Sequence, residues 1–357
     1  MIKTLTSWRA ALVLCIVLYH AGVQCMQAPT MMGVSFFFMS SGMLLAMNHS
    51  RVEAGWRRWM AWTAERACRF YPIHWLALAL TLLGLWMVGQ LAVDWTLIPN
   101  ALLLQPWFPA REVILSYNKP SWFLGALLFC YACYPWLSRH YATLRLRWQV
   151  LLIVAVMATL VVVLPHLSTP ARYFTYFLPL VRLCDFALGI TLARVARLIT
   201  TSRFKTSTLK STIIELAALL LVLELLFIDE MTTLLLPWEE YVLWWIPVAL
   251  LLLTCAVLNG LEGYVGRLMS WRPLVWLGTL SLEIYMLHGV AEAIYCRLVA
   301  PVAGHWGWMI YDQHTWLALP ILVLLAWAVH RLLWGRSRAW GKALASAIGD
   351  ENHPPRQ

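Results

Sequence analysis

The chain has 357 residues, of which 61% are hydrophobic and only 12% are charged, and its formal net charge is +10. A soluble domain of this size carries about 25% charged residues, so the composition excludes an ordinary soluble enzyme. Several apolar runs reach or approach the roughly 20 residues that cross a bilayer as a helix. Because backbone groups in lipid must be hydrogen-bonded within their own segment, we predict an all-α polytopic membrane protein.

The surplus of positive charge indicates membrane topology rather than binding to nucleic acid. Arginine and lysine gather in short links between apolar runs, as the positive-inside rule predicts for cytoplasmic loops. These basic segments are 51–69, 139–147, 194–210 and 331–342. The link 229–240 is acidic instead. We therefore expect both termini in the cytoplasm and the links 91–118 and 297–313 on the opposite side.

The apolar runs predict a bundle of about ten transmembrane helices, formed by residues 1–335 and followed by a polar, partly disordered cytoplasmic tail, 336–357. Residues 51–70 place tryptophans among arginines, which is typical of an amphipathic helix lying on the membrane surface, separate from the next span. The predicted spans are 8–26, 33–49, 72–90, 121–138, 149–165, 173–194, 212–228, 241–258, 275–296 and 315–334.

The first span carries two ionisable residues on one face. Arg9 and His20 are eleven residues apart, which on a helix brings them to within about 20° of each other and about 16 Å apart along the axis. A span over 8–26 puts Arg9 near the cytoplasmic edge and His20 well inside. An ionisable group at that depth is costly unless it faces a partner or a water-filled cavity. His20 is therefore the first functional candidate.

Two further motifs lie at the ends of spans. Arg66 and Arg69 are neighbours on one helix face, and paired guanidinium groups are well suited to phosphates. Arginines that flank a span are also expected from topology alone. Trp122 opens the fourth span in the string Ser-Trp-Phe-Leu, where it contacts substrate or belongs to the interfacial aromatic belt.

Two spans contain polar groups in apolar surroundings. In the sixth, Arg182 and Asp185 are three residues apart, so they can form a structural ion pair or contact a substrate. In the ninth, polar residues recur at helical spacing and must face other helices or a cavity. This polar stripe consists of Ser281, Tyr285, His288 and Glu292. The remaining histidines, including His330, are interpreted as ordinary side chains at span ends.

Taken in order, these motifs resemble the acyltransferase-3 family of integral membrane proteins. The first helix of that family carries arginine, ten residues and histidine, and the second reads Gly-Val-x-x-Phe-Phe-x-x-Ser-Gly. The chain departs from the family at Ser35, where an acidic residue is frequent. The matching positions are Arg9 and His20; Gly33, Val34, Phe37, Phe38, Ser41 and Gly42; Arg66 and Arg69; Trp122; Arg182, Asp185 and Gly189; and Ser281, Tyr285 and His288.

The resemblance implies an O-acyltransferase of the bacterial inner membrane. It would move an acyl group from cytoplasmic acyl-coenzyme A to a hydroxyl of a cell-surface glycan or its lipid-linked precursor. Acetyl is the first choice for this acyl group, and succinyl is the alternative. His20 would act as the general base, since neutral imidazole has a pKa near ambient pH, or carry the acyl group transiently. Arg9 would organise the site or bind a coenzyme phosphate.

The same resemblance supplies roles for the other candidates. Arg66 and Arg69 would bind the acyl-coenzyme A, and five residues would contact substrate: Ser41, Trp122, Asp185, Tyr285 and His288. No metal is expected, because the eight cysteines and the histidines lack metal-ligand spacing. The alternative function is a transporter or flippase for a surface-polymer precursor. Such a protein should show corresponding broken helices in two repeated halves, and the sequence shows no such repeat.

Overall fold

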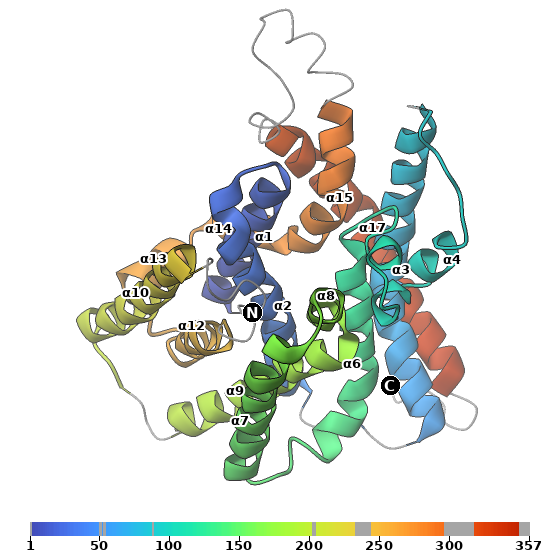
Figure 1. Cartoon of the computed structure of the whole chain (residues 1–357). Helices are drawn as coiled ribbons and strands as arrows, with labels where there is room; N and C mark the ends of the chain where they lie inside the picture. The colour runs from blue at the N-terminus through green and yellow to red at the C-terminus, as the bar shows by residue number, and fades with distance from the viewer. Residues whose placement is uncertain are drawn as a thin grey trace, which may run out of the picture. The chain divides into compact units, whose positions relative to one another are not determined.

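The computed structural model describes residues 2–49, 52, 55–87, 89–201, 205–232, 244–295 and 318–349. The link 297–313, residues 233–240 of the acidic link and residues 350–357 of the tail lie outside these ranges. Within them every regular element is a helix, which confirms the all-α class (Figure 1). The chain divides into two compact units. The first is Met1–Ser50, His140–Tyr176 and Leu180–Ser281, and the second is Arg51–Arg139, Phe177–Pro179 and Leu282–Gln357.

The first unit is organised around its N-terminal helix, α1, which packs against α2, α13 and α14. A second group, in which α10 contacts α12 and α13, completes the unit. Its helices are α1 (Lys3–His20), α2 (Gln27–Asn48), α7 (Leu146–Val163), α8 (Thr169–Phe177), α9 (Pro179–Thr201), α10 (Thr208–Thr232), α12 (Trp245–Val257), α13 (Tyr264–Met269) and α14 (Arg272–Thr279).

Glycines let the helices of the first unit approach to backbone contact. A methyl group at Gly42 of α2 would overlap the Phe186 carbonyl of α9, and one at Gly189 of α9 would overlap the Met39 carbonyl of α2. Small residues at helix crossings give membrane proteins their close packing, because lipid supplies no hydrophobic force between helices. The two glycines therefore fix where α2 crosses α9.

The second unit is built on two long antiparallel helices, α3 (Trp56–Met87) and α17 (Leu319–Gly349), which pack along much of their length (Figure 1). A Cβ at Gly341 of α17 would lie 2.9 Å from the Glu65 carbonyl oxygen of α3. The remaining helices of the unit are α4 (Leu97–Ala101), α5 (Arg111–Ile114), α6 (Ser121–Arg139) and α15 (Ser281–Ile294).

The separate surface helix predicted for residues 51–70 is not present. Residues 56–87 form one continuous helix, α3, that passes through Pro72 without a break. Its tryptophans pack on α6: Trp62 donates its indole N–H to the Tyr131 carbonyl at 2.8 Å. Tyr131 lies four residues before Pro135, which has no N–H to offer, so the indole replaces the missing helical hydrogen bond. The aromatic residues thus join two helices.

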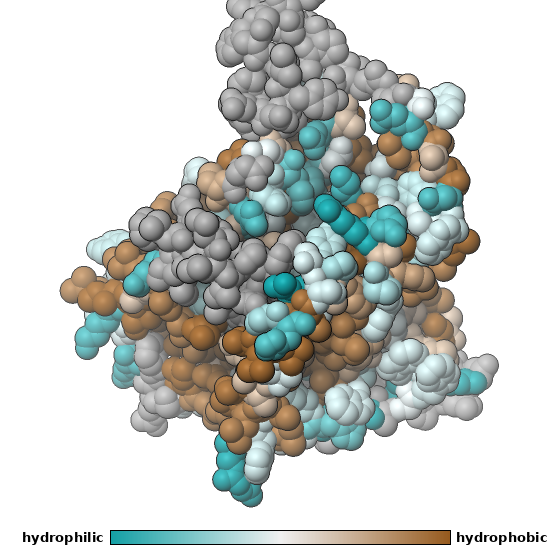
Figure 2. All heavy atoms as spheres, viewed as in Figure 1, coloured by the Kyte–Doolittle hydropathy of each residue, from teal (hydrophilic) through white to brown (hydrophobic). Residues whose placement is uncertain are grey.

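Each of the ten predicted spans coincides with a helix or a pair of consecutive helices. Among the described residues, four helices are long and apolar enough to cross a membrane, or up to six if each bent pair is one span. Large apolar side chains line the exposed surface of α7 (Figure 2). The membrane class is supported, while the ten crossings and the cytoplasmic termini stay predictions.

Several predicted boundaries differ from the structure, and two of these differences affect the first span and the tail. The first span was predicted over 8–26, but α1 runs from Lys3 to His20 because the chain turns at Gly22, whose φ is +92°. Residues 336–349 of the predicted tail are not disordered but continue α17 as a helix.

Candidate functional site

His20 is the last residue of α1, and its side chain is exposed. The sequence predicted His20 well inside a span over 8–26, and the structure places it at the end of α1, 5.6 Å from the ring of Tyr19. Arg9 lies on the same helix, half-buried, about 16 Å away by the helix rise.

Arg9 connects the first two sequence motifs. Its guanidinium carbon lies 5.8 Å from the centre of the Phe37 ring, which belongs to the aromatic run of α2. Cations are attracted to the face of an aromatic ring, more strongly where water is excluded. Phe37 therefore helps to hold Arg9 in place. Ser41 of α2 is half-buried in the same unit.

Asp185 is fully enclosed in the first unit. Its carboxylate lies 2.8 Å from a guanidinium nitrogen of Arg182, and neither side chain has any exposed surface. The Ser35 hydroxyl and the Trp245 indole also lie near the carboxylate. This arrangement matches the structural ion pair that the sequence allowed, and it brings Ser35, the residue at which the chain departs from the family pattern, against an acid from another helix.

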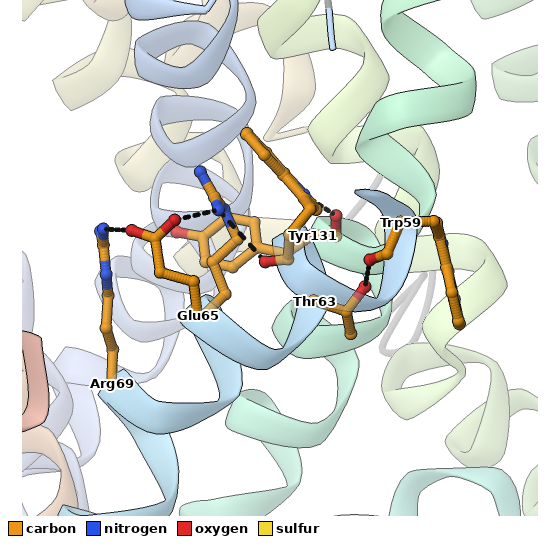
Figure 3. Close-up of polar contacts among 7 residues, drawn as sticks. Trp59, Thr63, Glu65, Arg69 and Tyr131 are labelled. Atoms are coloured by element: carbon orange, nitrogen blue, oxygen red, sulfur yellow. Dashed lines mark hydrogen bonds and ion pairs between the residues drawn. The ribbon is translucent and has the colours of Figure 1, made fainter. Parts of the chain in front are cut away.

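In the second unit, Arg66 and Arg69 share one carboxylate. Glu65 pairs with Arg69 (Figure 3), which lies 2.6 Å from one carboxylate oxygen, and with Arg66, which lies 3.2 Å from the other. Arg66 is only 3% exposed, stacks on the Trp62 ring and donates to the Trp62 carbonyl. Arg69 is 37% exposed. Of the two arginines, Arg69 is the one that a phosphate can reach.

The predicted substrate residues of the second unit are buried among aromatic rings. Trp122 packs edge-on against Phe177, with ring centres 4.7 Å apart, and Tyr285 packs on Phe123 at 5.2 Å. The Nδ1 atom of His288 lies 2.7 Å from the Tyr285 carbonyl oxygen. Ser281, Tyr285 and His288 are buried and Glu292 is half-buried, so three of the four residues of the polar stripe face inward as predicted.

Sequence reasoning missed one pair of ionisable residues in the second unit. The Nδ1 atom of His330 on α17 lies 2.8 Å from a carboxylate oxygen of Glu283 on α15. His330 was interpreted as an ordinary residue at a span end, and Glu283 was not singled out. The available signal was that both residues interrupt apolar spans, where an ionisable group requires a partner.

The structure thus groups the predicted site residues by unit. Arg9, His20, Ser41 and Asp185 belong to the first unit, and Arg66, Arg69, Trp122, Tyr285 and His288 belong to the second. Within the first, the His20 imidazole is exposed, whereas the Arg182–Asp185 ion pair is fully enclosed. Within the second, the Arg69 side chain is more exposed than that of Arg66, and the inward stripe holds α15 in the bundle.

Comparison with known proteins gives one family and one relative. A family model described as an acyltransferase domain matches residues 2–340 of the chain. The acyltransferase MdmB of Streptomyces mycarofaciens is 29% identical to the chain over 189 residues, which cover 46% of this chain and 46% of the relative. The match therefore spans about half the length of that relative. No solved structure matches the chain.

Proposed function

Because the chain belongs to the acyltransferase-3 family, we propose that it is a bacterial inner-membrane O-acyltransferase with a surface-glycan acceptor. It takes acetyl from cytoplasmic acetyl-coenzyme A and delivers it to a hydroxyl of the glycan or of its lipid-linked precursor. The family match over residues 2–340 supports the assignment to acyl transfer. The exposed imidazole of His20 supports its choice as the general base.

The chemistry needs a group that removes a proton from a weak nucleophile. A sugar hydroxyl is a poor nucleophile at neutral pH, and an imidazole can take its proton as the oxygen attacks the acyl carbon. Coenzyme A leaves as a thiolate when the carbon–sulfur bond of the thioester breaks. His20 suits this role because its ring is accessible at the end of α1.

The donor site is assigned to the cationic end of α3. Arg69 binds a phosphate of the coenzyme, since a guanidinium offers two parallel N–H donors to phosphate oxygens. Arg66 acts through Glu65, holding the carboxylate that in turn orients Arg69. This assignment divides the predicted pair into one ligand-binding arginine and one positioning arginine.

The predicted orientation places donor and acceptor at opposite ends of α1. With the N-terminus in the cytoplasm, the 18 residues of this helix span about 27 Å, and His20 lies at its outer end. Surface glycans are exposed on that side. The acyl group must therefore travel from a cytoplasmic thioester toward His20, and the pantetheine arm of the coenzyme covers part of that distance.

The test is acetyl transfer by membranes that contain the full chain. Radiolabelled acetyl-coenzyme A is supplied with candidate glycans, and label in the glycan is counted for the wild type and for His20→Ala. We expect a loss of at least 100-fold on removal of the base. His49→Ala is the matched control, because His49 is an exposed histidine directly after α2 in the same unit.

Wild-type transfer by a folded His20→Ala variant would remove His20 from the mechanism. A chain that moved glycan across the membrane without transferring label would be a transporter instead. The family match does not favour that alternative.

A further inference from the structure

The second unit contains a buried carboxylate–histidine pair that the function proposed above does not use. Glu283 of α15 is 5% exposed, and one of its oxygens lies 2.8 Å from Nδ1 of His330 on α17. The ring of Trp334, one helical turn further along, stacks on the imidazole with ring centres 5.1 Å apart and planes within 20°. The imidazole is therefore held on its edge by a carboxylate and on its face by an indole.

This arrangement gives the imidazole a defined chemistry. A carboxylate that accepts a hydrogen bond from Nδ1–H fixes the tautomer and leaves the lone pair on Nε2. The His330 side chain is 19% exposed, and Nε2 is the ring nitrogen that does not face Glu283. Both parts of an activated nucleophile are present: a nitrogen with a lone pair and a carboxylate that stabilises positive charge on the ring.

The pair lies at a useful distance from the cationic end of α3. Gly341 of α17 contacts α3 between Glu65 and Cys68, beside Arg69. His330 is eleven residues nearer the start of α17, so it lies about 16 Å away along the helix. The pantetheine arm has about twelve bonds between its phosphate oxygen and its sulfur, equivalent to four extended residues, or roughly 14 Å. A coenzyme held by Arg69 can thus bring its thioester close to His330.

We propose, on the basis of the function proposed above, that His330 takes the acyl group from acyl-coenzyme A before the acceptor receives it. Glu283 is the positioning residue for His330. The Nε2 lone pair attacks the thioester carbonyl carbon, a carbon–nitrogen bond forms, the carbon–sulfur bond breaks, and coenzyme A leaves as a thiolate. The Nδ1 proton passes to Glu283, so the acylated ring is neutral.

The acceptor reaction then restores the pair. The hydroxyl oxygen attacks the acyl carbon as its proton passes to a general base. The carbon–nitrogen bond breaks, its electrons return to the imidazole, and the Nδ1 proton returns from Glu283. In this order, His330 carries the acyl group in the reaction with the donor. His20 remains the proposed general base in the reaction with the acceptor.

The experiment traps the acyl-enzyme. The purified full-length protein is mixed with radiolabelled acetyl-coenzyme A without any glycan, denatured, and assayed for label bound to the polypeptide. Peptide mass analysis locates the modified residue. His330→Gln removes the nucleophile while its amide can still donate to Glu283, and Glu283→Gln weakens the pairing. His74→Gln is the control, since His74 is a buried histidine of the same unit that bonds a backbone carbonyl.

The wild type should bind up to one acetyl group per chain, on the peptide that contains His330. His330→Gln should lose at least 100-fold of this label, Glu283→Gln should acquire it at least tenfold more slowly, and His20→Ala should keep it. An unlabelled wild-type chain that still acetylates glycan, or label that survives in His330→Gln, overturns the proposal. If no glycan is acetylated but His330 is labelled, the acceptor assignment fails while the acyl carrier stands.

Discussion

A single carboxylate gives the two arginines of the Arg66–Arg69 motif different roles. Glu65 bonds both, yet Arg66 is enclosed by Trp62 and α6 while Arg69 faces outward. Removing a buried partner leaves charge and polar groups without compensation, whereas removing an exposed one changes little. Exposure, which sequence spacing does not report, decides which of them can bind a ligand.

We therefore expect the two arginine variants to fail in different ways. Arg69→Ala should raise KM for acetyl-coenzyme A at least tenfold and lower the free energy of unfolding by less than about 1 kcal/mol. Arg66→Ala should lower the free energy of unfolding by about 2 kcal/mol. Steady-state kinetics and thermal unfolding in detergent measure both quantities. Equal KM values for Arg69→Ala and the wild type would exclude Arg69 from the donor site.

The Arg182–Asp185 pair provides a second prediction on single residues. Asp185→Asn should lower the free energy of unfolding by about 3–5 kcal/mol, because it leaves the Arg182 charge buried without its partner. Replacing both residues by apolar ones, Arg182→Met with Asp185→Leu, should recover much of that loss. A double variant that folds well but transfers no acetyl would instead assign Asp185 to the substrate.

At the scale of helices, close crossings depend on residues without side chains. Gly42→Ala or Gly189→Ala should each lower the free energy of unfolding by about 3 kcal/mol, because the new methyl meets backbone atoms that cannot give way. Gly84→Ala is the control: a Cβ at this position in α3 meets nothing within 4 Å, and alanine favours the helix by about 1 kcal/mol. Thermal unfolding of the three variants separates the crossing from helix propensity. Equal stability would show that α2 and α9 do not meet here.

Helices were easier to predict than their ends. Apolar runs located a helix or helix pair at all ten predicted segments, but the run that begins the chain remains apolar past its true end. Gly22, which adopts a positive φ directly after the cap of α1, was the signal for that end. In α3, the tryptophans and arginines looked amphipathic because their partner surface, the proline-interrupted backbone of α6, lies some 70 residues away in sequence.

The same limit applied to the candidate site. His20 and Arg9 were identified because their spacing lies within one helix. Glu283 and His330 are separated by 47 positions in the chain, and spacing gives no information on which acid a distant histidine will meet. Ser35 stands where the family pattern frequently has an acidic residue. The carboxylate near it comes instead from Asp185 of another helix, which spacing in the sequence does not indicate.

At the scale of the whole molecule, orientation can be read with a native cysteine. Cys25 is exposed in the short turn between α1 and α2, five residues after His20. With the N-terminus in the cytoplasm, this turn lies outside. A variant that keeps only Cys25 should react in intact cells with a maleimide that does not cross membranes. Reaction only after the cells are opened would reverse the orientation and place His20 on the coenzyme side.

The helical end of the chain has a practical consequence for anyone who makes this protein. Residues 336–349 look dispensable because they are polar, but Ser337 and Gly341 are buried and Gly341 lies against α3. A shortened gene that stops at Gly335 would remove the support of the turn that carries Arg69. Affinity tags, reporter fusions and truncated expression clones should therefore be joined only beyond Gly349.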